Sequence, residues 1–196
     1  LCLAQFLVWT TIPTIIYPNI SLDVAEMVAW GHEWNWGYFK HPPLVAWLAE
    51  IGRIVSGSGR PWAILLFAQL VNVGTMIVLW RICRRRLPAV LSFLAVFGFV
   101  LSVNFSQGIY VREFLNNNTL LLLFTALSVW FALEALFGGG FRWWCLLGLS
   151  LGFGMLSKYQ IIILVAALGA FMLADRESRH WLRRPQPYVS ALIALA

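Results

Sequence analysis

The chain has 196 residues, of which 61% are hydrophobic, 15% are aromatic and only 11% are charged. A soluble domain normally carries about a quarter charged residues, so this composition excludes an ordinary water-soluble globule and a disordered tail. The net charge of +6 would suggest nucleic-acid binding in a soluble protein, but the mean hydropathy of +0.79 indicates a membrane protein instead. The length allows about six membrane spans.

Apolar runs separated by polar stretches predict the spans. The runs are residues 1–17, 61–80, 87–105, 117–137, 143–157 and 160–174, and a seventh begins at about 188. The fifth and sixth runs are short for a span of about 20 residues, so they predict a tight helical hairpin with Lys158 at its tip. A single long kinked helix is the alternative. The chain starts and stops inside apolar runs, so we expect a piece of a longer protein. The first run lacks the basic region of a signal peptide, so we do not expect it to be cleaved off.

The arginines predict which side of the membrane each loop faces. When the runs alternate across the membrane, nine arginines and three carboxylates fall on one side, whereas the charges on the other side cancel. The nine are Arg81, Arg84, Arg85, Arg86, Arg142, Arg176, Arg179, Arg183 and Arg184. The positive-inside rule places this side in the cytoplasm and residues 18–60 outside, so nucleic acid is not an expected partner. The cysteines fall near cytoplasmic ends, so we expect no disulfide.

The outward loop of residues 18–60 is longer than two adjacent spans need. Residues 23–34 predict one helix, and Pro43 predicts the start of a second that continues to about residue 55, because proline suits the first helical position. Both helices are short, rich in Trp and Leu, and partly charged. We therefore expect them to lie in the membrane interface among the lipids.

Two carboxylates near the start of the first loop helix have two interpretations. Asp23 and Glu26 are three residues apart, which places them on one helix face. In the structural interpretation Asp23 caps the helix and Glu26 completes a pair like a capping box. In the functional interpretation a carboxylate is held at the membrane surface as a general base. The two interpretations are compatible, since a cap also fixes the position of the carboxylate.

Two cations outside the loop also have functional interpretations. Lys158 lies near membrane depth, where a lysine either extends its ammonium to the interface or has a function. At the outward tip of a hairpin its ammonium could bind a lipid phosphate. Arg112, in the next outward loop, is a second candidate. Positive charge of this kind would stabilise an anionic leaving group.

The order of motifs resembles a known family. Asp23 is followed by Trp36-Gly37-Tyr38 and then by His41-Pro42-Pro43-Leu44 and Trp47, and later by Asn116-Asn117-Asn118-Thr119 and Leu156-Ser157-Lys158-Tyr159. This order resembles GT-C fold glycosyltransferases, and most of all the bacterial branch of the dolichyl-phosphate-mannose–protein mannosyltransferase superfamily, which includes the lipid A aminoarabinose transferases. The resemblance implies an all-α, polytopic, GT-C-like transmembrane bundle in the bacterial inner membrane, with its active face outward. The chain would be the N-terminal part of that domain.

The resemblance also implies a reaction. A sugar on a polyprenyl phosphate would be transferred, with inversion, to a hydroxyl of a lipid, glycan or protein. Asp23 matches the aspartate of the family and would be the base. Val24 replaces the neighbouring acidic residue, and Glu26 would substitute for it.

The remaining site residues are implied in the same way. Lys158, Lys40, His41 and Arg112 would bind the phosphate, and Tyr38, Asn117, Asn118 and Tyr159 would contact the sugar or the acceptor. His41 stands where the aminoarabinose transferases have a lysine before Pro-Pro. No cofactor and no metal site is implied, although the sequence leaves dependence on a divalent metal open.

Two other functions remain open at this point. A transporter or lipid-handling protein without covalent chemistry also contains intramembrane charges and short broken helices. The clustering of charges in an outward loop, rather than at the membrane midplane, argues against it. The third possibility is an inactive fragment of a transferase.

Overall fold

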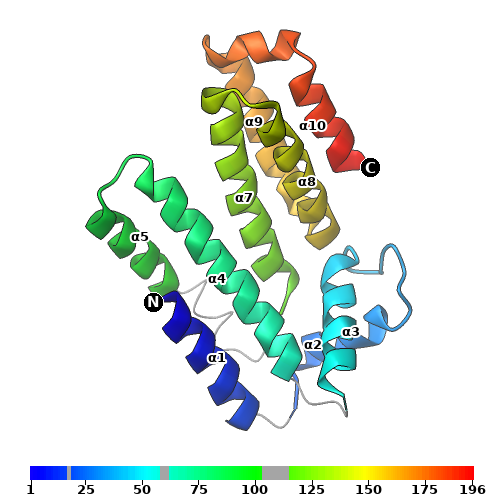
Figure 1. The fold of residues 1–196 in the computed structure, drawn as a ribbon. Helices are drawn as coiled ribbons and strands as arrows, with labels where there is room; N and C mark the ends of the chain where they lie inside the picture. Colours follow the sequence, from blue (N-terminus) through cyan, green and yellow to red (C-terminus); the bar gives the residue numbers. More distant parts are fainter. Residues whose placement is uncertain (17–18, 58–61, 103–114) are drawn as a thin grey trace. The chain divides into compact units, whose positions relative to one another are not determined.

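The computed structural model describes residues 1–16, 19–57, 62–102 and 115–196, and these residues form helices without any strand (Figure 1). They fall into two compact units, Leu1–Leu123 and Phe124–Ala196. Two helices, α4 (Trp62–Arg84) and α7 (Asn117–Gly138), are long and apolar enough to cross a membrane. The expectation of an all-α membrane protein is confirmed.

Each predicted apolar run contains a helix, but most of these helices are shorter than a span. Besides α4 and α7 they are α1 (Cys2–Ile16), α5 (Ala89–Leu101), α8 (Phe141–Ser157), α9 (Ile162–Ala174) and α10 (Gln186–Leu195). That all seven cross the membrane stays a prediction.

The first unit is built around α4. Both α1 and α5 pack along it, and the loop helix α3 (Leu44–Ser56) contacts it as well. The buried amide of Gln5 on α1 donates a hydrogen bond to the Gln69 side-chain oxygen on α4, at 3.2 Å. A polar bond of this kind joins two helices in a setting where lipid gives apolar surfaces no reason to associate.

The second unit contains the predicted hairpin. α8 ends at Ser157, Lys158 is extended with φ −163° and ψ 130°, and a short 3₁₀ turn, η1 (Tyr159–Ile161), leads into α9. α9 runs back in the direction opposite to α8 (Figure 1). The structure therefore has the reversal of a hairpin at Lys158, and the single kinked helix is wrong. A second 3₁₀ segment, η2 (Ser178–Arg183), connects α9 to α10.

Glycines on α8 let α10 approach closely. A Cβ added at Gly148 would lie 2.5 Å from the carbonyl oxygen of Ser190, and one added at Gly152 would lie 3.2 Å from that of Ala194. Small residues four apart are the usual means by which membrane helices bring their backbones together. On another side of α8, the Ser150 hydroxyl lies 2.9 Å from the Ser128 hydroxyl of α7.

We predict that Gly148→Ala destabilises the full-length protein in detergent, because its methyl group would overlap the α10 backbone. Overpacking of this kind costs about 1–3 kcal/mol, and it should lower the thermal unfolding midpoint. Gly169→Ala on α9 is the matched control, since a Cβ there meets open space. An equal midpoint for the two variants would show that α8 and α10 are not packed as described.

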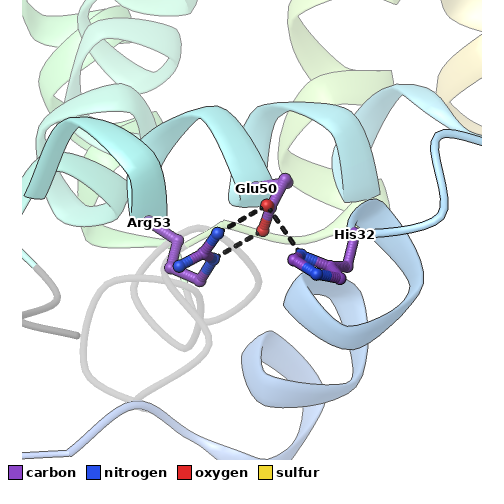
Figure 2. Close-up of polar contacts among 3 residues, drawn as sticks. All are labelled: His32, Glu50 and Arg53. Atoms are coloured by element: carbon purple, nitrogen blue, oxygen red, sulfur yellow. Dashed lines mark hydrogen bonds and ion pairs between the residues drawn. The ribbon is translucent and has the colours of Figure 1, made fainter. Parts of the chain in front are cut away.

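In the segment between α1 and α4, a buried carboxylate joins α2 (Leu22–Gly31) to α3 (Figure 2). Glu50 of α3 is 2% exposed, and it accepts hydrogen bonds from Arg53 Nε at 2.7 Å and Arg53 Nη2 at 2.8 Å. Its Oε1 also lies 3.0 Å from Nδ1 of His32, which follows the last residue of α2. Gly31 makes this approach possible, since a Cβ there would lie 2.8 Å from that of Glu50. We call His32, Glu50 and Arg53 the carboxylate clasp.

The clasp determines the ionisation of Glu50. The hydrogen bonds from Arg53 are the main cause that lowers the Glu50 pKa from 4.5 to about 2, and they outweigh the opposing effect of burial. The carboxylate is therefore ionised at neutral pH, and Nδ1 of His32 must carry the proton of their hydrogen bond. Two donors from α3 and one from the end of α2 thus satisfy one buried anion.

We predict that Glu50→Gln loses about 1.5–3 kcal/mol of stability at neutral pH, the usual value of hydrogen bonds to a charged group. Because the folded-state pKa is depressed, this stabilisation is present above about pH 4.5 and is lost as the pH falls toward 2. Thermal unfolding midpoints of the two proteins should therefore converge over that range. Glu33→Gln is the control, because Glu33 is an exposed carboxylate that accepts a hydrogen bond from the Asn35 amide. A difference in unfolding midpoint that stays constant over this pH range would contradict the lowered pKa assigned to Glu50.

Candidate functional site

The start of α2 differs from the prediction. The N-cap is Ser21, whose Oγ accepts a hydrogen bond from the Val24 backbone N–H at 3.4 Å, so the capping role assigned to Asp23 is wrong. Asp23 lies in the first helical turn, with an exposed side chain. A carboxylate there is favoured by the partial positive charge of the helix N-terminus. Asp23 therefore suits the start of α2 without being the cap.

The end of α2 also differs. The helix stops at Gly31 instead of continuing to residue 34, and a turn follows in which Trp34 has a positive φ of 52°. Its backbone N–H donates to the Gly31 carbonyl at 3.1 Å. A tryptophan rarely adopts this left-handed conformation, so the turn is held by its surroundings. α3, by contrast, begins directly after Pro43, as predicted.

Glu26 is paired with Lys40, which comes from the loop between α2 and α3. The ammonium Nζ lies 2.7 Å from Glu26 Oε1 and 5.8 Å from the centre of the Trp30 ring. Glu26 and Trp30 are one turn apart on α2, so both contact the same cation. This pairing leaves Glu26 poorly suited to the role of a substitute base, since its carboxylate serves a lysine.

Aromatic side chains surround the same position. The Trp30 and Tyr38 rings are stacked, with centroids 5.5 Å apart and planes 9° from parallel. The His41 ring meets Trp30 at 61° and 6.4 Å. We call Glu26, Trp30, Tyr38, Lys40 and His41 the Lys40 cluster. It places four of the predicted site residues around one tryptophan.

Backbone hydrogen bonds hold the loop that carries this cluster. The Tyr38 backbone N–H donates to the His41 carbonyl, and the Asn35 backbone N–H donates to the Tyr38 hydroxyl, both at 3.1 Å. The Trp47 indole N–H of α3 donates to the Asn35 carbonyl at 3.1 Å. Partial burial is the main cause that raises the Tyr38 pKa, so its hydroxyl is protonated at neutral pH. The loop therefore has a defined conformation in the described residues.

Asp23 does not join the Lys40 cluster. It lies about one turn before Glu26 on α2. No hydrogen bond or ion pair joins its carboxylate to another residue that the structure describes. An exposed carboxylate of this kind can accept a proton from a substrate without first breaking a protein contact.

The predicted asparagines lie in the first turn of α7. Asn116 caps this helix, since its Oδ1 accepts hydrogen bonds from the backbone N–H groups of Asn118 at 2.9 Å and Thr119 at 3.0 Å. Asn117 is 6% exposed, and its Oδ1 has no hydrogen-bond partner among the described residues. Asn118 is exposed. Of the two, Asn117 has the side chain that needs a further donor.

The remaining predicted site residues lie in the second unit or outside the described residues. Lys158 and Tyr159 belong to the second unit, where Lys158 is half-buried and Tyr159 is 65% exposed. Arg112 lies outside the described residues. Within the described ranges no group of three His, Cys, Asp or Glu side chains could hold a metal ion.

Two features of this region do not follow from the sequence. For Trp30, at the centre of the Lys40 cluster, the sequence predicts only a Trp-rich helix among the lipids. For Glu50, the anion of the carboxylate clasp, it predicts only one of the charges that cancel on one side of the membrane. A charged residue within an apolar helical stretch is the signal that could have identified Glu50, because such a residue is buried only when paired.

Comparisons with known proteins place the chain in a family. Residues 40–196 match the dolichyl-phosphate-mannose-protein mannosyltransferase family. The matched segment starts at Lys40, so it includes Lys40, His41 and Lys158 but not Asp23 or Glu26.

A curated relative is similar over part of its length. The lipid A galacturonosyltransferase RgtD of Rhizobium johnstonii is 24% identical over 155 residues, which are 75% of this chain and 30% of that protein. The chain thus spans about a third of its relative, and no solved structure matches it. Because the family match covers most of the chain, the protein belongs to the dolichyl-phosphate-mannose-protein mannosyltransferase family.

Proposed function

We propose that the full-length protein is a membrane glycosyltransferase that moves a sugar from a polyprenyl-phosphate-linked donor to an acceptor hydroxyl on the outward face of the membrane. Family membership is the observation that carries the proposal. It favours the transferase over the transporter considered from sequence. The relative that acts on lipid A suggests a lipid as the acceptor, with a glycan or a protein as the other classes.

The chemistry needs two groups of the protein, a base and a cation. The acceptor oxygen attacks the anomeric carbon, the bond between that carbon and the phosphate oxygen breaks, and the electron pair leaves with the phosphate. Asp23 accepts the proton of the attacking hydroxyl. A cation stabilises the charge that develops on the phosphate oxygen.

Lys40 is the first cation in this proposal. Its ammonium is half exposed beside the Trp30–Tyr38 stack, in the same loop as His41. Lys158 and Arg112 are further candidates for contact with the phosphate. Tyr38, Asn117, Asn118 and Tyr159 are proposed to contact the sugar or the acceptor. The Oδ1 of Asn117 has no partner among the described residues, so it suits a substrate hydroxyl, which could donate to it.

Orientation is tested by labelling. In a background without Cys2, Cys83 and Cys145, we expect Phe39→Cys to react with an impermeant maleimide in intact cells and Glu177→Cys to react only after lysis. Both positions are exposed, so accessibility in the folded protein does not limit the reaction. Labelling of position 177 in intact cells would contradict the proposed topology.

The role of Asp23 is tested by Asp23→Asn in the full-length protein. Asparagine preserves the shape but cannot take the proton, so sugar transfer from a polyprenyl-phosphate donor should fall by roughly 10²-fold or more. Stability should change little, because the cap is Ser21.

Ser21→Ala is the matched control for this experiment. Loss of the cap should lower stability by about 0.5–2 kcal/mol, while transfer at permissive temperature stays far above that of Asp23→Asn. Normal turnover by a stable Asp23→Asn variant would remove Asp23 from the mechanism.

A further inference from the structure

Lys40 is already held by an anion in the structure, and this has a consequence for any phosphate that binds it. The ammonium lies 2.7 Å from Glu26 Oε1, and the two side chains are 50% and 31% exposed. Both groups are therefore open to solvent, and the ion pair can exchange. An exposed ion pair contributes little to stability, so a phosphate could displace the carboxylate.

The position of Lys40 does not depend on Glu26 alone. The ammonium also lies 5.8 Å from the centre of the Trp30 ring, which is stacked on Tyr38. A cation near the face of an indole is attracted to the ring. The aromatic pair can therefore keep Lys40 in place while its anionic partner changes. Glu26 and Trp30 are fixed on one helix, so the carboxylate stays beside the exchanging cation.

The two phosphates of the proposed reaction differ in charge. This step rests on the proposed function. A lipid-linked sugar donor is a phosphodiester with one negative charge, whereas the polyprenyl phosphate product is a monoester with about −1.5 to −2 at neutral pH. A lysine that stabilises the leaving group therefore binds the product more strongly than the donor. Without a competing anion, the product would be retained.

We propose that Glu26 is the counter-ion that displaces the polyprenyl phosphate product from Lys40. Glu26 is thus a positioning residue that acts through Lys40 and takes no proton from the acceptor. Its carboxylate returns to the ammonium as the phosphate leaves, and no covalent bond changes in this step. The pairing in Figure 2 differs in kind, because the Glu50 carboxylate is buried, whereas that of Glu26 is open to solvent.

The direction of the effect of Glu26→Gln on phosphate binding distinguishes the proposed role of Glu26 from a catalytic one. Glu26→Gln should tighten binding of farnesyl phosphate to the full-length protein in nanodiscs by about two- to five-fold, the range given by an exposed ion pair. Lys40→Gln should weaken binding of farnesyl phosphate. The double variant with Glu26→Gln should bind it no more tightly than Lys40→Gln alone. In the transfer assay, Glu26→Gln should increase inhibition by added farnesyl phosphate by a similar factor.

The controls isolate the charge of the ion pair. Glu33→Gln removes another exposed carboxylate of the same loop that does not contact Lys40, and it should leave the affinity unchanged. Farnesol, which lacks the phosphate, should bind all variants equally. Glu26→Ala should reproduce the effect of Glu26→Gln, and thermal unfolding midpoints confirm that both variants are folded.

Two results would overturn the proposal. One is unchanged or weaker binding of farnesyl phosphate by the folded Glu26 variants. The other is a gain that persists in the Lys40→Gln background, since the effect would then not pass through Lys40. Failure of the proposed function is a separate result: the wild-type protein would bind farnesyl phosphate through Lys40 but transfer no sugar.

Discussion

The arrangement of α2, α3 and the loop between them depends on one buried anion. Glu50 has almost no exposed surface, and an unpaired carboxylate there would be very costly. Arg53 and His32 supply the compensating hydrogen bonds, and His32 can reach Glu50 only because α2 ends where Gly31 permits close contact with α3. The clasp fixes the end of α2 against α3. The intervening loop must then return over α2, which brings Lys40 beside Glu26 and Trp30.

The two carboxylates of α2 and the one on α3 show how surroundings divide the roles of one chemical group. Glu50 is buried and held by three hydrogen bonds, so it is structural. Glu26 is partly exposed and paired with one half-exposed cation, so it suits an exchange of partners. Asp23 is exposed in the first turn of α2, where a substrate could approach it. Sequence spacing alone could not separate these roles.

The presence and the approximate positions of the helices could be predicted from the apolar runs, because a segment buried in lipid must be a long apolar helix. The prediction of local details was wrong where two residues were both suited to the same role. Ser21 caps α2 although Asp23 is also a good cap, because the helix begins at Leu22. The break at Lys158 could be located, because four polar residues interrupt two apolar runs. The pairing of Glu26 with Lys40 could not be found, because it joins residues fourteen apart through an irregular loop whose path depends on Glu50.

The close contact of α8 with α10 has a consequence for the route of a lipid-linked substrate. Not even one methyl group fits between Gly148 and the backbone at Ser190, so a hydrocarbon tail cannot pass between these helices at that level. The two backbones approach each other at successive turns of α8, at Gly148 and Gly152. In the proposed reaction, the polyprenyl chain of the donor therefore cannot enter between α8 and α10 at that level. It must reach the reaction centre along a different pair of helices.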